Sequence, residues 1–147
     1  MARYDPYRYG VTLESHERCL QIERSGAVLT LWLNRPELHN AFDAGLIARL
    51  TAALEAAGHD ASVRAVVLAG HGASFSAGAD MQWMRGMAAA SEADNREDSL
   101  ALARLMRTLD ELPNRPWPGS MARPSAAASA WSPAATSPSP APRPASA

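Results

Sequence analysis

The sequence predicts an α/β domain over residues 17–115 of the 147-residue chain, and three observations lead to that class. Two short strand-like runs flank Ser25-Gly26, which is typical of an antiparallel hairpin. A segment with helical spacing of its apolar residues comes next, and a run of β-branched residues follows it. A helix between two strands is the usual crossover of a parallel pair, so the three segments indicate a βαβ unit.

The hairpin is expected from strands at residues 19–23 and 27–34. Cys19 lies within their apolar alternation and is predicted to be a small buried hydrophobic residue. The segment after the second strand is expected to be a loop, because Pro36 cannot continue a central strand.

A helix is predicted after this loop, with Asp43 as its N-cap and Gly58 at its end. Its apolar residues lie on one face: Leu46, Ile47, Leu50, Ala53, Leu54 and Ala57. Residues 63–70, "VRAVVLAG", then form the near-continuous apolar run of a strand that is covered on both faces.

Two more helices are expected after a glycine-rich loop. The first is "ADMQWMRGMA", with Asp80 as N-cap, and the second runs over residues 91–112, with Ser91 as N-cap. One apolar stripe on the second consists of Leu102, Leu105, Met106, Leu109 and Leu112.

The two ends of the chain differ from this pattern. Residues 1–16 show no periodicity and are predicted to be a polar arm. Residues 116–147 contain 10 Ala, 8 Pro and 7 Ser, with no acidic residue. Such a segment buries too little apolar surface to offset its ordering entropy, so a disordered Ala/Pro/Ser-rich tail is expected.

Composition excludes several classes of function. The formal net charge is −1 without a basic cluster, so a nucleic-acid partner is not expected. No apolar run approaches the roughly 20 residues that span a bilayer, and the N-terminus lacks a secretory signal, which favours a cytoplasmic protein with no membrane partner. His59 and His71 lack a second ligand at helical spacing, so no metal site is expected.

The segment "SAGADM" carries the candidate chemistry. Ala77, Gly78 and Ala79 lie between a buried strand and the start of a helix, where free backbone N–H groups and the helix dipole favour a negatively charged oxygen. The N–H of Ala79 is the predicted donor. A plain turn has the same composition, and spacing alone leaves this alternative open.

The motifs "LTLWLNRPELHNAFD" and "VRAVVLAGHGASFSAGADMQWM", in this order, resemble the N-terminal half of the enoyl-CoA hydratase/isomerase (crotonase) family over roughly residues 18–115. The continuation "SAGADMQWMRGMA" is most similar to methylglutaconyl-CoA hydratase-like members. The resemblance implies a crotonase-like ββα spiral, incomplete in this chain, and a parent family that assembles as homotrimers or hexamers.

The resemblance also implies an acyl-CoA substrate and no separate cofactor, because coenzyme A is part of the substrate. Ala79 would be the first oxyanion donor when water adds to an α,β-unsaturated acyl-CoA. The residues implied in CoA binding are Leu38, His39, Ala41, Ala77, Gly78, Asp80 and Met81. Glu37 stands where the family often has a basic residue, which puts one phosphate contact in doubt.

Two assignments near this site have simpler alternatives. His39 lies at the implied CoA entrance, but a loop histidine more often forms a local hydrogen bond, so no catalytic role is assigned to it. The apolar side chains after Asp80 could line an acyl pocket, although residues at helical spacing more often belong to a core; they are Met81, Trp83, Met84 and Met87.

In the implied family, the second oxyanion donor and the catalytic glutamates follow a later glycine triplet. If the codons of residues 116–141 are read one nucleotide earlier, they can encode such a segment. Ala126-Ala127-Ala128 then becomes the glycine triplet. The fixed bases in the codons of Trp117 and Trp131 are consistent with the shifted frame. The sequence therefore suggests a frameshift near residues 114–116, with an authentic disordered tail as the alternative.

Without those groups the chain is expected to be nearly inactive, with a rate roughly 10⁴- to 10⁷-fold below that of an intact hydratase. Three other functions stay open: an enoyl-CoA isomerase of the same family, a non-catalytic CoA-binding fragment, and an adaptor whose Pro-rich tail binds partners.

Overall fold

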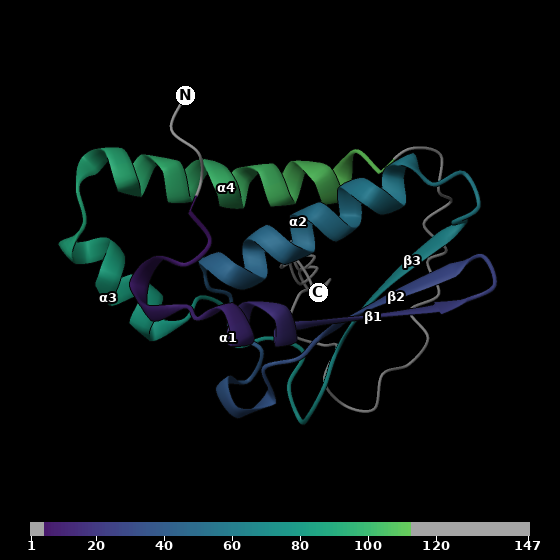
Figure 1. The fold of residues 1–147 in the computed structure, drawn as a ribbon, viewed down its shortest axis with the longest axis horizontal. Coiled ribbons are helices and arrows are strands. Elements are labelled where there is room, and N and C mark those ends of the chain that lie inside the picture. The colour runs from purple at the N-terminus through teal and green to yellow at the C-terminus, as the bar shows by residue number, and fades with distance from the viewer. Residues whose placement is uncertain (1–4, 113–147) are drawn as a thin grey trace, which may run out of the picture.

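The structure is a computed structural model that describes residues 5–112. A three-stranded sheet forms one layer, and helix α2 lies between this sheet and helix α4 (Figure 1). The α/β class predicted from the sequence is confirmed. The expected tail at residues 116–147 lies outside the described residues.

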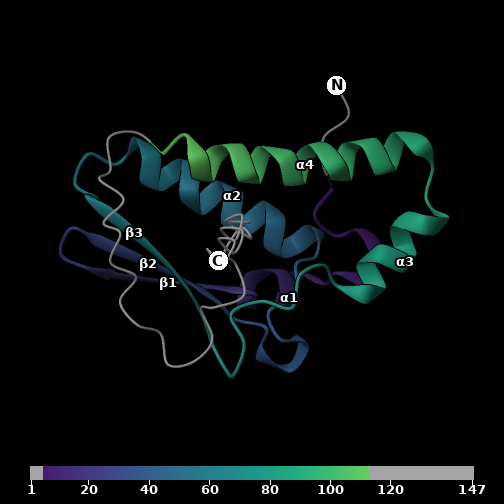
Figure 2. The ribbon, with the colours of Figure 1, turned by 180° about the vertical axis from the view of Figure 1, so that it is seen from behind.

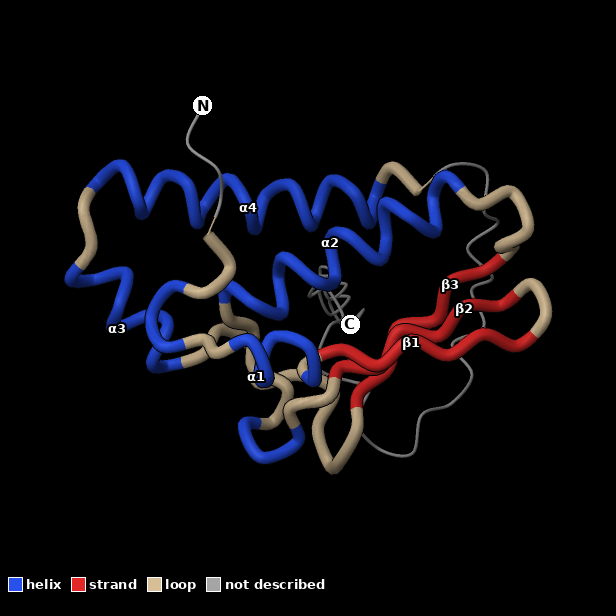
Figure 3. Tube along the Cα trace, in the orientation of Figure 1, coloured by secondary structure: helices blue, strands red, loops and turns tan. Residues whose placement is uncertain are grey.

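Strands β1 (Leu20–Ser25) and β2 (Val28–Leu33) form the predicted antiparallel hairpin, and β3 (Ala65–Gly70) runs parallel to β2. The strand order is β1-β2-β3, so β2 is central (Figure 3). The hairpin turn lies at Gly26-Ala27, one residue later than predicted. Gly26 adopts a φ of +58°, a left-handed conformation that glycine takes without a steric penalty.

Helix α2 (Ala44–His59) is the crossover between β2 and β3, which confirms the βαβ unit. Its apolar face packs on the sheet, and Leu46, Leu50 and Leu54 are at most 2% exposed. The predicted end at Gly58 is wrong by one residue, because Asp60 N–H donates to the carbonyl of Ala56 and closes a further turn.

Helices α3 (Met81–Ala89) and α4 (Glu92–Asp110) follow with the predicted N-caps, Asp80 and Ser91. Helix α4 packs along α2 on the side away from the sheet, as both orientations show (Figure 2). Leu105 is 1% exposed at the centre of the predicted stripe, and the other stripe residues are partly buried against the core.

The polar arm predicted for residues 1–16 contains regular structure, contrary to expectation. A 3₁₀ turn, η1, spans Arg8–Gly10 and helix α1 spans Leu13–Arg18. Thr12 and Ser15 form a reciprocal capping box, in which each side chain accepts from the other residue's backbone N–H. Local hydroxyl chemistry therefore starts a helix too short to show apolar periodicity.

Strand β3 pairs only with β2 among residues 5–112, so its other edge is open there. Val67 points to the face opposite α2 and is 41% exposed. The carboxyl ends of β2 and β3 lie together because these strands are parallel, and the loops that leave them carry the candidate site.

Candidate functional site

Two loops meet at the carboxyl end of the sheet, one after β2 and one after β3. A parallel β-bridge joins Phe42 in the first loop to Ala79 in the second. Phe42 N–H donates to the Gly78 carbonyl at 2.7 Å, and Asp80 N–H donates to the Phe42 carbonyl at 2.9 Å. Ala77 N–H adds a third contact, 2.8 Å from the His39 carbonyl. The two segments implied in CoA binding are therefore neighbours.

The bridge fixes the direction of one amide. The Gly78 carbonyl and the Ala79 N–H belong to one trans peptide unit, in which the two groups point in opposite directions. Since the carbonyl is directed at Phe42, the Ala79 N–H is directed away from that loop. Ala79 is exposed, and within residues 5–112 its N–H forms no hydrogen bond.

Gly78 provides the backbone conformation that this arrangement needs. Its φ is +91°, which a residue with a Cβ rarely adopts, although a Cβ there would meet no atom within 4 Å. The requirement for glycine is therefore conformational.

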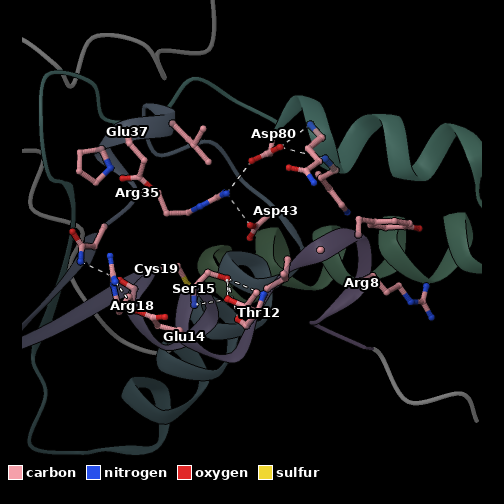
Figure 4. Close-up of a pocket in the computed structure, with 18 residues that line it drawn as sticks. Arg8, Thr12, Glu14, Ser15, Arg18, Cys19, Arg35, Glu37, Asp43 and Asp80 are labelled. Carbon is pink, nitrogen blue, oxygen red and sulfur yellow. Dashed lines mark hydrogen bonds and ion pairs between the residues drawn. The ribbon is translucent and has the colours of Figure 1, made fainter.

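Arg35 ties both loops together through its guanidinium group (Figure 4). Nη2 lies 2.9 Å from Oδ2 of Asp80 and 3.0 Å from Oδ2 of Asp43, while Nη1 donates to the Ala41 carbonyl at 2.6 Å. The side chain is 12% exposed, so these contacts are largely shielded from water. Shielding makes them stronger than surface ion pairs.

The two carboxylates that Arg35 contacts are the N-caps of two helices. Asp43 accepts from Leu46 N–H at the start of α2, and Asp80 accepts from Gln82 N–H at 2.7 Å and Trp83 N–H at 3.2 Å at the start of α3. Burial alone would raise the pKa of Asp80, but these N–H groups and Arg35 together lower it. Asp80 is therefore ionised at neutral pH.

Asn40 holds the base of the second loop. Its side chain is fully buried, and Nδ2 donates to the carbonyls of His71 and Ser74, each at 2.8 Å. Its Oδ1 accepts from the backbone N–H of Arg35 at 2.8 Å. The amide thus links the start of the first loop to the segment that leads into residues 77–80.

The predicted site residues divide into an exposed and a buried group. The exposed group is Leu38, His39, Ala77, Gly78, Ala79 and Met81. Ala41 and Asp80 are 6% and 8% exposed, respectively, and their carbonyl and carboxylate groups are held by Arg35. His39 Nδ1 lies 3.1 Å from Ser74 Oγ, the local hydrogen bond that its loop position favours.

The apolar residues of α3 also divide. Trp83 is 5% exposed and belongs to the core, and Met87 packs against that core. Met81 and Met84 are 62% and 49% exposed, so they do not belong to it. These four residues are therefore neither all part of the core nor all exposed for an acyl pocket.

A pocket of about 440 Å³ lies beside the site, between residues 8–19 and the two loops (Figure 4). Arg35, Asp43 and Asp80 line it together with Leu38 and Trp83. The residues at positions 77–79 do not line it. Ala79 is therefore outside this pocket.

Neither metal chemistry nor a membrane span has support in residues 5–112. No group of three or more His, Cys, Asp or Glu side chains there could hold a metal ion. Within the same part of the chain, no helix is both long and apolar enough to cross a bilayer.

Sequence reasoning missed two residues that organise the site, Arg35 and Asn40. A lone arginine before Pro36 carries no local signal for three partners that lie up to 45 positions away. Asn40 has a φ of +54°, and an asparagine in a loop is a common choice for that conformation, so this feature could have been suspected.

Comparisons with known proteins give one family. The family model "Enoyl-CoA hydratase/isomerase" matches residues 23–112. A Mycobacterium bovis protein named "Probable enoyl-CoA hydratase echA6" is 50% identical over 60 residues, which cover 41% of this chain and 24% of that protein. A "4-chlorobenzoyl coenzyme A dehalogenase-2" of Arthrobacter is 41% identical over 63 residues, or 43% of this chain and 23% of that protein.

A solved structure agrees with these matches. The crystal structure of an enoyl-CoA hydratase from Shewanella pealeana superposes with a TM-score of 0.63 at 36% identity. The superposition covers 65% of this chain and 36% of that one. The matched part of the chain thus corresponds to about a quarter to just over a third of the length of these relatives.

Proposed function

Because the chain belongs to the enoyl-CoA hydratase/isomerase family, we propose that its two loops form half of a site at which water adds to an α,β-unsaturated acyl-CoA. The single observation that carries the proposal is the Ala79 N–H, which is exposed, points away from its bridge partner and is unbonded within residues 5–112. It is the first of the two donors that an oxyanion hole requires.

The chemistry of hydration explains why such a donor matters. When water adds to the β-carbon, electrons move toward the thioester carbonyl, and its oxygen gains the negative charge of an enolate. A fixed N–H directed at that oxygen stabilises the charge without reorganisation, and one such donor is worth about 2.7–4 kcal/mol. The remaining charge needs a second donor from another segment.

The bridge also strengthens the donor. Phe42 N–H polarises the Gly78 carbonyl from 2.7 Å, and this carbonyl shares its peptide unit with the Ala79 N–H. A hydrogen bond accepted at one end of a peptide makes its N–H a better donor at the other. The short contact at Gly78 therefore supports the role of Ala79.

The exposed residues beside Ala79 suit a CoA chain. Ala77 and Gly78 are small, so a ligand can approach the backbone closely, and Leu38 and Met81 offer apolar surface, at 44% and 62% exposed, on either loop. We assign the pantetheine and adenine contacts to this surface. Ala41 and Asp80 contribute through the backbone they hold in place, since both are buried.

Hydration also requires a group that activates the water molecule. By family resemblance, this group is a pair of glutamates in segments that follow the glycine triplet. The relatives include a dehalogenase as well as hydratases, so an N-terminal half of this kind serves more than one CoA reaction. The alternatives are an enoyl-CoA isomerase, which would use the same Ala79 donor, and a non-catalytic CoA-binding protein. Assembly into trimers or hexamers stays a prediction.

We further propose that residues 116–147 are read out of frame and that the chain is therefore nearly inactive. The support is the change of composition at Pro116 and the glycine triplet that the shifted frame can encode at Ala126-Ala127-Ala128. These residues lie outside the described part of the structure. Nucleotide sequence across codons 110–130 tests the proposal, and stop codons in the shifted frame would refute it.

The Ala79 donor is tested by infrared spectroscopy of crotonyl-CoA that carries ¹³C in its thioester carbonyl. We expect the carbonyl stretch to shift to lower frequency on binding, because a hydrogen bond weakens the C=O bond. Ala79→Pro removes the N–H and should abolish the shift, while CoA itself, which has no thioester carbonyl, binds both proteins equally. An unshifted stretch in the saturated wild-type complex would refute the donor role.

A further inference from the structure

We infer that Arg35 is a positioning residue, which acts by locking the peptide that presents the Ala79 N–H. The inference rests on the proposed function, in which this N–H contacts the thioester oxygen. Arg35 itself does not touch that oxygen in the proposed arrangement; it acts through the two loops that it joins.

The contacts of Arg35 lie on both sides of the bridge between the loops. On the first loop, Nη1 holds the Ala41 carbonyl and Nη2 holds the Asp43 carboxylate, so the residues before and after Phe42 are both fixed. On the second loop, Nη2 holds the carboxylate of Asp80, the residue after Ala79. One side chain thus brackets Phe42 and holds the residue that follows Ala79.

The geometry of the donor makes such a bracket necessary. Gly78 is conformationally permissive, and nothing lies within 4 Å of the position where its Cβ would be, so local sterics do not restrain the peptide. The strength of a hydrogen bond falls steeply as its angle departs from linearity. Hydrogen bonds hold the segment before this peptide, from Ala77 N–H to the His39 carbonyl and from Gly78 N–H to Ser76 Oγ. On the Asp80 side, the direction of the Ala79 N–H depends on the two bridge hydrogen bonds and on Arg35.

The positive charge of Arg35 has a second role, which is to offset the negative charge of two nearby carboxylates. Asp43 and Asp80 are both largely buried beside the site, and two uncompensated carboxylates would oppose negative charge on a nearby oxygen. The guanidinium offsets part of that charge. Its planar fork reaches three acceptors at once, whereas the ammonium of lysine is a point charge that cannot reproduce the fork.

The inference is tested with Arg35→Gln and Arg35→Lys in the full chain. Arg24→Gln is the matched control, because Arg24 also joins separate segments through Asp60 and Ser62 but lies at the hairpin end of the sheet. The first measurement is amide hydrogen exchange at Phe42 and Asp80, which reports the bridge without any ligand. The second is the carbonyl stretch of bound ¹³C-labelled crotonyl-CoA, which reports the donor.

We expect exchange at the two bridge amides to be roughly tenfold faster in Arg35→Gln, because hydrogen bonds to charged groups are lost. Arg35→Lys should give a smaller increase, and Arg24→Gln none. The carbonyl shift should fall in the same order, while exchange in the core of α2 stays unchanged. A merely structural role would instead accelerate exchange throughout the core.

The two proposals fail in different ways. Unchanged exchange at Phe42 and Asp80 in both Arg35 variants would overturn the positioning role, whatever the spectrum of the ligand. Faster exchange with a full carbonyl shift would overturn it too, since the donor would be directed without Arg35. A wild-type complex with no shift refutes the proposed donor instead. If Arg35→Gln does not fold, Arg35→Lys carries the test through the same measurements.

Discussion

Arg35 and Arg8 each contact more than one carboxylate, but the pKa of one carboxylate is lowered beside Arg35 and the pKa of another is raised beside Arg8. Arg35 contacts Asp43 and Asp80, and the pKa of Asp80 is lowered. Arg8 contacts Glu97 and Asp98 on α4, as well as Asp94 at 3.3 Å, and the pKa of Asp98 is raised. Both arginines are poorly exposed, so exposure of the cation does not explain the difference.

The difference lies in the backbone donors. Asp80 precedes a helix and accepts two N–H groups that have no partner within that helix. Asp98 lies in the middle of α4, where the backbone N–H groups are already used, and burial is the largest cause of its raised pKa. Tyr9 donates to its Oδ2 at 3.0 Å, but its Oδ1 has no hydrogen bond among the described residues.

This contrast indicates which of the two clusters can position groups for catalysis. The Arg35 cluster fixes charges and peptides at the N-terminal ends of α2 and α3, beside an unbonded N–H. The Arg8 cluster instead fastens residues 8–10 to α3 and α4, and a Cβ at Gly86 would lie 2.3 Å from the Tyr9 ring. We interpret the second cluster as a packing device, in which an incompletely satisfied carboxylate is tolerated.

The largest effect is expected from Asp80→Ala. It removes an N-cap and leaves the buried Arg35 with one carboxylate, so the free energy of unfolding should fall by about 2–4 kcal/mol. Urea denaturation at pH 7 measures the change. Asp80→Asn loses the ion pair but keeps a capping side chain and should cost less, and equal losses in the two variants would contradict a separate contribution from the N-cap.

The contribution of the Asp80 carboxylate to the free energy of unfolding should decrease as the pH falls. The pKa of Asp80 is lowered in the folded state, so its contribution is present above the unfolded value of about 3.9 and is lost as the pH falls through the folded value. The gap between wild type and Asp80→Asn should therefore narrow below about pH 4. A gap that stays constant to pH 2 would contradict the lowered pKa.

An intermediate effect is expected from Gly86→Ala, which tests the packing of the Arg8 cluster. The added methyl would collide with Tyr9, so either the ring moves or the segment detaches, at a cost of about 1–3 kcal/mol. Thermal unfolding measures the loss. Gly86→Ala combined with Tyr9→Ala should recover part of it, and a double variant that loses the full sum would show that the two residues do not touch.

The smallest effect, with the opposite sign, is expected from Asp98→Asn. Because burial raises the pKa of Asp98, the ionised form opposes folding, and a neutral isostere should raise the free energy of unfolding at pH 7. The advantage should shrink as the pH falls through the folded pKa and disappear by about pH 3, below the unfolded pKa of about 3.9, because both states are then protonated. Stability curves at the two pH values test this, and a destabilised variant at pH 7 would show that Arg8 outweighs burial.

The elements that local chemistry dictates were predictable, and those that depend on distant partners were not. Asp43, Asp80 and Ser91 were identified as caps because a short oxygen-bearing side chain before an apolar run is a local signal. The hairpin and the βαβ unit followed in the same way. The partners of Arg35 depend on how α2 and α3 approach each other, and no spacing in the sequence encodes that approach.

The short helix α1 shows a second limit. Its hydroxyl cap at Thr12 was present in the sequence, but the helix has no buried residue, so the apolar pattern that identifies longer helices is missing. The position of Ala79 was predictable from the loop composition. The free direction of its N–H was not, because that depends on which carbonyl Phe42 binds.

The amide proton of Ala79 reports most directly on its proposed role. In a protein with ¹⁵N-labelled alanine, its resonance should move downfield when saturating crotonyl-CoA replaces CoA, because a new hydrogen bond forms to the thioester oxygen. The buried amide of Ala53 in α2 is a control within the same spectrum and should not move. An Ala79 resonance that is identical in the two saturated complexes would contradict a donor at this position.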